Sequence, residues 1–219
     1  MWRRRRLMHH RQQQPRLHWT RVLRGRGATP NGVSWVSGAF AALAGLMFYI
    51  GLSAPAREGG MPLLLAVLGL QGRRRCNRVD GVLAPQARMV ARVGEVSHRA
   101  PDGLSDVLVC AGLGYGLQAG LPWAAQLGWA AALCCVASAY TRMLGLACGP
   151  PEPRQGPMRR VQRMQWLSLA GALALPLQWM GQSRLAAWRL IEALAVLIAD
   201  ALLTVAVRPR TIVRTLEQR

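Results

Sequence analysis

The residues best suited to chemistry lie between positions 77 and 106. Asn77 and Asp80 are three residues apart, and Asp102 and Asp106 are four residues apart. Steps of three and four residues put side chains on one face of a helix. Carboxylates are unfavourable inside or beside a bilayer unless a cation neutralises them, and hard oxygen ligands favour magnesium or manganese over zinc. We therefore predict a divalent-metal pocket built from two neighbouring helices.

Such a pocket would support transfer of a phosphate-linked group. Two divalent cations can clamp a pyrophosphate and stabilise charge as one phosphate oxygen leaves and another attacks. Three small residues, Gly81, Ala84 and Gly94, accompany the acidic ones. Small side chains let a ligand or another backbone approach closely, so we expect these positions to contact the substrate.

An alternative is that the carboxylates only balance charge. Asp80, Asp102 and Asp106 have arginines nearby in the sequence, namely Arg73 to Arg75, Arg78 and Arg99. A charge network alone would not require glycine and alanine at fixed spacings beside it, which favours the metal pocket. The sequence leaves both interpretations open.

Composition indicates a membrane protein. The 219-residue chain has 28 basic residues, all arginine, against 9 acidic ones, and its net charge is +19. Such a balance suggests either nucleic acid or an anionic membrane surface as a partner. At roughly 20 apolar residues per crossing, the first, fourth and sixth of six apolar stretches could span a bilayer unaided. The stretches are Gly32 to Ala54, Met61 to Leu70, Val107 to Ala119, Leu121 to Leu146, Trp166 to Met180 and Leu185 to Val207.

The arginines also predict the orientation in the membrane. All but three of the 28 fall before the first stretch, in residues 71–100, in residues 141–163 or from Arg208 onward. Short basic loops stay in the cytoplasm, so this distribution fits six transmembrane helices with both termini cytoplasmic. Arginines divided among four such segments do not form the continuous patch that nucleic acid requires, so we expect no nucleic-acid partner.

The predicted fold is therefore all-α and integral to the membrane. Residues 1–28 form a basic cytoplasmic arm whose mixture of apolar residues and arginines over 16–26 predicts an amphipathic juxtamembrane helix on anionic lipid. Residues 29–207 form one six-helix membrane domain, and residues 208–219 form a basic cytoplasmic tail. Asp200 lies inside the last apolar stretch, where an acid usually has a partner, either an arginine or the pocket.

The second apolar stretch is too short to span a membrane. Met61 to Leu70 is ten residues, which gives about 15 Å of helix, half of a roughly 30 Å hydrocarbon core. If the helix continues toward Ala84, it carries arginines and Asp80 near membrane depth, where a polar helix must face protein or water. Asp102 lies at the start of the next span in the same way. We expect two half-polar helices to face each other across a cavity open to the cytoplasm.

These residues resemble a known family, the CDP-alcohol phosphatidyltransferases. Its signature is D-x2-DG-x2-AR-x8-G-x3-D-x3-D, and this chain has a similar pattern from Asn77 to Asp102. Residues 29–34, TPNGVS, are similar to the TPN-x2-[TS] sequence that leads those enzymes into their first transmembrane helix. Three positions depart from the signature: Asn77 and His98 stand where the family has aspartates, and Pro85 where it has arginine. A bacterial subgroup with CN-x2-DG-x2-A, GE and PD-x3-D is closer to this chain.

The resemblance implies an integral-membrane enzyme of the bacterial inner (cytoplasmic) membrane. It would transfer a phosphatidyl or other substituted phosphate group from CDP-diacylglycerol or a CDP-alcohol to an alcohol acceptor, with release of CMP. The implied cofactor is Mg²⁺ or Mn²⁺, and the implied ligands are Asn77, Asp80, His98, Asp102 and Asp106. The family register favours Asp102 as the general base, and Asp106, one turn further, competes for that role. A catalytically impaired family member that binds nucleotide or lipid is the alternative.

Two further features extend this prediction. Arg154, Arg159 and Arg160 form a basic loop before the fifth stretch, which could hold a substrate phosphate or could follow from membrane orientation alone. The resemblance also allows a homodimer. Small-residue stripes such as Gly112/Gly116 could serve that contact or pack within one subunit.

Overall fold

The computed structural model describes residues 30–55, 58–83, 92–148 and 157–217. Within these residues the chain forms long α-helices and no strand, which confirms the predicted all-α class. The helices are α2 (Pro30–Ser53), α3 (Gly60–Leu83), α4 (Arg92–Gln118), α5 (Ala124–Ala147), α6 (Arg160–Trp179) and α7 (Ser183–Glu217).

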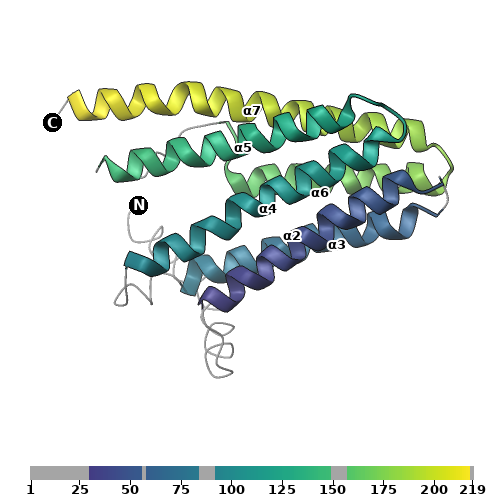
Figure 1. Ribbon diagram of the computed structural model, residues 1–219, viewed down its shortest axis with the longest axis horizontal. Helices are drawn as coiled ribbons and strands as arrows, with labels where there is room; N and C mark the ends of the chain where they lie inside the picture. The colour runs from purple at the N-terminus through teal and green to yellow at the C-terminus, as the bar shows by residue number, and fades with distance from the viewer. Residues whose placement is uncertain (1–29, 56–57, 84–91, 149–156, 218–219) are drawn as a thin grey trace, which may run out of the picture.

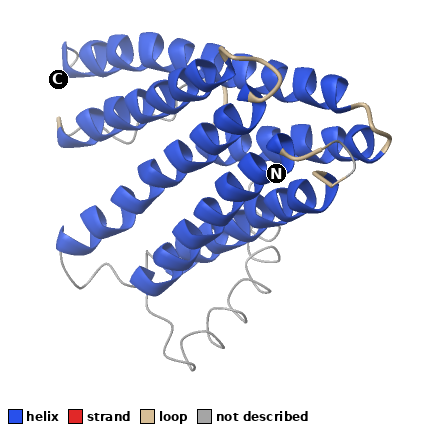
Figure 2. Cartoon of the chain, turned by 45° about the vertical axis from the view of Figure 1, so that its right-hand side comes forward, coloured by secondary structure: helices blue, strands red, loops and turns tan. Residues whose placement is uncertain are grey.

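The six helices run up and down and pack as a closed ring (Figures 1 and 2). α2 packs against both α3 and α4, α5 packs between α4 and α7, and α6 completes the ring between α7 and α3. The start of α2 and the end of α7 lie at the same end of the bundle (Figure 1). Within the described residues, the six helices therefore return the chain to the end of the bundle at which α2 starts.

Within the described parts of the chain, three helices are long and apolar enough to cross a membrane by length and composition. These segments are Gly32–Ser53, Ala124–Gly145 and Ser183–Arg214. They coincide with the first, fourth and sixth apolar stretches, which confirms that part of the prediction. Large apolar side chains are exposed around the bundle, including Trp35 at 72% and Leu133 at 65%. A helical bundle that is apolar on its outside as well as its inside is typical of a membrane protein.

α2 and α4 approach each other closely through glycines. A Cβ atom on Gly116 would lie 2.7 Å from the carbonyl oxygen of Phe48, and one on Gly112 would overlap the backbone of Gly45. Larger side chains at these positions would push the helices apart. The Gly112/Gly116 stripe therefore packs within one subunit, which was one of its two predicted uses.

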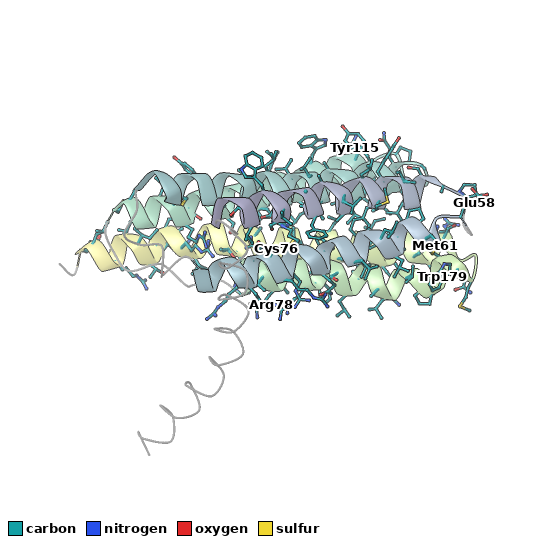
Figure 3. All side chains as sticks on the ribbon, turned by 90° about the horizontal axis from the view of Figure 1, so that it is seen from below. Glu58, Met61, Cys76, Arg78, Tyr115 and Trp179 are labelled. Atoms are coloured by element: carbon teal, nitrogen blue, oxygen red, sulfur yellow. The ribbon has the colours of Figure 1, made fainter. Side chains whose placement is uncertain are left out.

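The bundle has an apolar half and a polar half. Phe48, Leu63, Leu113 and Leu194 are among the fully buried side chains. Toward the end where α3 finishes and α4 begins, the interior instead holds arginine, aspartate, serine and threonine. Figure 3 shows Glu58, Met61 and Trp179 at the other end of the bundle, with Cys76 and Arg78 further along α3.

α7 continues as one helix beyond the predicted membrane domain. Residues 208–217, which were expected to form a separate tail, extend it to Glu217. Pro209 lies inside the helix without ending it. The basic arm over 1–28 lies outside the described residues.

Candidate functional site

The motif residues lie on two helices at the same end of the bundle. Asn77, Asp80 and Gly81 belong to the last part of α3. Gly94, His98 and Asp102 belong to the first half of α4, and Asp106 lies at its middle. Figure 1 shows these two helix segments at one end. The described side chains of this set are Asn77 and Asp106. The side chains of the other five, together with all of Ala84 and Pro85, lie outside the part that the structure describes.

Asn77 is held from α2. The hydroxyl of Ser37 donates a hydrogen bond to Asn77 Oδ1 over 2.8 Å. An amide oxygen has two lone pairs, so this bond leaves one acceptor site on Oδ1. The side chain is half-buried, and its oxygen is of the hard type that Mg²⁺ and Mn²⁺ accept.

Asp106 forms a buried ion pair with Arg73. Arg73 Nη2 lies 2.8 Å from Asp106 Oδ1, and the two side chains are 0% and 7% exposed. Arg73 Nη1 also donates to the sulfur of Met164 on α6 over 2.9 Å. Asp106 therefore has an arginine partner, as expected from the alternative in which the carboxylates only balance the charge of nearby arginines.

A second polar contact joins α3 to α6. Gln71 Nε2 donates to Ser168 Oγ over 2.6 Å, and Arg74 Nη1 donates to Gln71 Oε1 over 2.8 Å. Arg75 and Arg78 on the same helix are exposed. The arginines of α3 therefore divide into one fully buried in the bundle, one partly buried and two at the surface.

Asp200 has an arginine partner. Its Oδ2 lies 2.5 Å from Arg163 Nε, and its Oδ1 accepts from the backbone N–H of Met158 over 2.8 Å. Both side chains of the ion pair are at most 5% exposed. This pair connects α6 to α7. Of the two partners expected for Asp200, an arginine or the metal pocket, the structure has the arginine.

The same guanidinium also contacts α5 and makes a second contact with α7. Arg163 Nη1 donates to Ser138 Oγ on α5, and Nη2 donates to Thr204 Oγ1 on α7, each over 3.1 Å. Arg208 Nη1 donates to the carbonyl oxygen of Ser138 over 2.7 Å. Because buried polar groups must be hydrogen-bonded, this network fixes α5, α6 and α7 relative to one another.

The predicted phosphate-binding loop is only partly described. Arg159 is exposed, and its backbone N–H donates to Gln162 Oε1 over 2.7 Å at the start of α6. Arg154 and the side chain of Arg160 lie outside the described part. Among the residues that were described, no three His, Cys, Asp or Glu side chains gather closely enough to hold a metal ion. The ligand set predicted from the sequence rests mainly on side chains beyond that part.

Three contributors were not anticipated from the sequence. Ser37 holds Asn77, Met164 contacts Arg73, and Ser138 joins two arginines. Serine and methionine are ordinary residues in an apolar helix, so nothing in their own type marks them. For Arg73 the sequence did hold a signal. It lies four residues before Asn77, and this spacing puts both residues on one helix face.

Comparison with known proteins identifies the fold. No protein-family model matches the sequence, and no curated protein does. The chain is similar to the crystal structure of phosphatidylinositol phosphate synthase of Mycobacterium tuberculosis in complex with manganese and citrate. The identity is 17%, the TM-score is 0.66, and the match covers 88% of this chain and 86% of that one. The apo form of the same enzyme matches with 18% identity, a TM-score of 0.58 and coverage of 86% and 94%. This chain therefore has the fold of phosphatidylinositol phosphate synthase, in agreement with the fold implied by its CDP-alcohol phosphatidyltransferase-like motif.

Proposed function

We propose that this protein transfers a phosphatidyl or other substituted phosphate group from a CDP-linked lipid or alcohol to an alcohol acceptor and releases CMP. The observation that carries the proposal is the placement of the motif on α3 and α4, in the fold of a phosphatidylinositol phosphate synthase. That synthase was crystallised with manganese. The fold supplies the arrangement, and the motif supplies the residue types that the chemistry needs.

The donor set fits a divalent cation. Asn77 offers a hard amide oxygen, oriented by Ser37, and Asp80 and Asp102 would contribute carboxylates from the two helices. His98 would add a nitrogen, which manganese accepts more readily than magnesium. When bound, the metal would neutralise the pyrophosphate charge and make CMP a better leaving group.

The residues of the chain would do the remaining work. Gly81, Ala84 and Gly94 would let the cytidine diphosphate approach the helix backbones. Asp102 would take the proton of the acceptor hydroxyl as its oxygen forms a bond to the lipid-linked phosphorus. The bond from that phosphorus to the CMP oxygen breaks, and CMP leaves with the electron pair. Arg159 and its neighbours Arg154 and Arg160 would attract an anionic headgroup.

A CMP-release assay tests this function. Purified protein is given CDP-diacylglycerol or a CDP-alcohol, with Mg²⁺ or Mn²⁺, and a panel of acceptors: glycerol phosphate, inositol phosphate, serine, choline and simple alcohols. We expect acceptor-dependent CMP release that Asp80→Ala and Asp102→Asn abolish. Glu192→Gln is the matched control, because Glu192 is an exposed acid paired with Arg189 on α7. Absence of CMP release with every donor and acceptor would contradict the proposal.

One observation favours a second candidate. Asp106 is paired with Arg73, which leaves two unassigned carboxylates, Asp80 and Asp102, in the motif. A catalytically impaired protein would bind CDP-linked ligands without releasing CMP. Equilibrium binding of a CDP-alcohol in the absence of turnover would identify it, and Asn77→Asp with His98→Asp would be expected to restore release.

We also propose an orientation with both termini in the cytoplasm of a bacterial cell. The end of α3, the start of α4 and the end of α7, which adjoin arginine-rich segments of the sequence, lie at one end of the bundle. A fluorescent reporter fused after residue 219 would then be active, and a periplasmic phosphatase fused there would be inactive. The reverse pattern would contradict this orientation. Anionic lipid would be the surface against which the arm over 1–28 rests.

A further inference from the structure

The two helices that carry the motif contact each other little along their lengths. α3 and α4 both pack extensively against α2, but in the described residues α3 has no comparable contact with α4. The side chain of Arg73 bridges them, through its 2.8 Å ion pair with Asp106. Among the described residues, α2 and this pair therefore connect the two helices that carry the motif.

The Arg73–Asp106 pair lies four residues from a motif residue on each helix. Arg73 precedes Asn77 by four residues on α3, and Asp106 follows Asp102 by four residues on α4. α3 runs toward the motif end of the bundle and α4 runs away from it (Figure 1). One helical turn is about 5.4 Å. The ion pair thus lies about one turn deeper in the bundle than the motif on both helices at once.

The contacts of Arg73 make this position specific. Its guanidinium is fully buried and contacts Asp106 on α4 and Met164 on α6. Ser37 on α2 separately holds Asn77 on α3. A shift of α3 by one residue, about 1.5 Å along its axis, would break these short contacts. Buried polar pairs are best documented as devices that fix the register of packed helices.

We propose that Arg73 and Asp106 are positioning residues that set the register of α3 against α4, and so the separation between the metal ligands on the two helices. This inference rests on the proposed function. It gives Asp106 a different role from the metal ligand or base expected from the sequence. Arg73 already neutralises the Asp106 carboxylate through Oδ1, which weakens what that carboxylate offers a cation, whereas the positioning role uses the pair as the structure has it.

Manganese binding to the purified full-length protein tests the role of the pair. Free and bound Mn²⁺ are distinguished by electron paramagnetic resonance for wild type, Asp106→Asn, Arg73→Met and the charge swap R73D/D106R. We expect each single variant to weaken Mn²⁺ binding by about tenfold, the effect typical of groups that orient metal ligands. The swap restores a pair of opposite charges, so its dissociation constant should return to within about threefold of wild type.

The same series separates positioning from ligation. If Asp106 were a metal ligand, Arg73→Met would free its carboxylate and leave Mn²⁺ binding unchanged or tighter. The swap, which has no carboxylate at 106, would then bind as weakly as Asp106→Asn. Either result would overturn the proposal.

Asp200→Asn is the matched control. It breaks the other buried arginine–aspartate pair, between α6 and α7. We expect it to lower the thermal stability of the protein, as Asp106→Asn does, while leaving the Mn²⁺ dissociation constant within about threefold of wild type. An equal loss of Mn²⁺ binding in both variants would show a general loss of stability, and the positioning role would be rejected.

A distance measurement without metal keeps the inference distinct from the proposed function. Spin labels are placed at Arg75 on α3 and Leu104 on α4, which are both exposed, after the five native cysteines are replaced by alanine. Double electron–electron resonance should give a narrow distance distribution for the parent and the swap, and a broader or shifted one for Asp106→Asn. An unchanged distribution in Asp106→Asn would overturn the inference. A parent that binds no Mn²⁺ would instead count against the proposed function.

Discussion

The hydroxyl of Ser37 donates to Asn77 Oδ1 over 2.8 Å, so a residue of α2 orients the first position of the motif on α3. The donor suits a carboxylate as well as an amide, because the oxygen atom it contacts is present in both side chains. The position is therefore built in a way that would also accept aspartate.

Asn77→Asp should strengthen metal binding. A carboxylate adds a negative charge to the ligand set while keeping the Ser37 hydrogen bond, and the charge of the ligands sets cation affinity. We expect the metal concentration for half-maximal CMP release to fall by roughly tenfold. The double variant with Ser37→Ala should lose part of that gain, because one hydrogen bond contributes about 1 kcal/mol. A rise in the required metal concentration for Asn77→Asp would contradict the assignment of this position as a ligand.

His98 should make the protein prefer Mn²⁺ to Mg²⁺. His98 replaces an oxygen ligand of the related motif with a nitrogen, and imidazole favours Mn²⁺ over Mg²⁺. We expect Mn²⁺ to activate CMP release at a lower concentration than Mg²⁺. His98→Asp should reduce the difference by making Mg²⁺ more effective. Equal activation by both ions in the wild type, unchanged in His98→Asp, would place His98 outside the ligand set.

Breaking the Arg163–Asp200 pair should destabilise the bundle. Asp200→Asn leaves a buried guanidinium without its negative partner, and removing one member of a buried ion pair typically lowers stability by about 3–5 kcal/mol. Tryptophan fluorescence during denaturation in detergent measures this loss. The comparison is Glu192→Gln, in a pair about 60% exposed, for which we expect a change of about 0–1 kcal/mol. Similar stability of the two variants would show that the buried network contributes little.

Arg159 should affect substrate affinity more than turnover. Its side chain is exposed at the start of α6, so Arg159→Gln should raise the KM for an anionic acceptor by about two- to fivefold, the range of an exposed charge contact, with kcat nearly unchanged. Arg210→Gln removes an exposed arginine from α7 and is the control. Equal effects of the two substitutions would indicate a general effect of positive charge at this surface.

The sequence predicted the helical class, the three apolar spans and the helices on which Asn77 and Asp106 lie. Apolar length and helical periodicity depend on the chain alone, so these features were accessible. The partner of Asp106 was not, although Arg73 was named among the arginines that could neutralise it. Choosing between a metal and an arginine requires knowing that Arg73 points inward while Arg75 and Arg78 point outward. That direction is decided by the packing of α3 against α2 and α6.

For Asp200, the sequence predicted that a partner exists but did not identify it. Its place inside an apolar stretch predicted a partner, and the chain has 28 arginines that could serve. Arg163 is the one selected, because α6 and α7 are packed as neighbours and the start of α6 is also tied to Asp200 through Met158. Partner choice here follows from which helices adjoin, and the spacing of residues along the chain does not contain that information.

The length of α7 has a practical consequence. Its 35 residues form a rod of about 52 Å, against a hydrocarbon layer of roughly 30 Å. The final turns, which carry Arg210 and Arg214, must therefore project past the lipid or tilt strongly within it. If they project, a purification handle joined after this rod is carried away from the bilayer surface, well separated from the interior contacts that hold the bundle together.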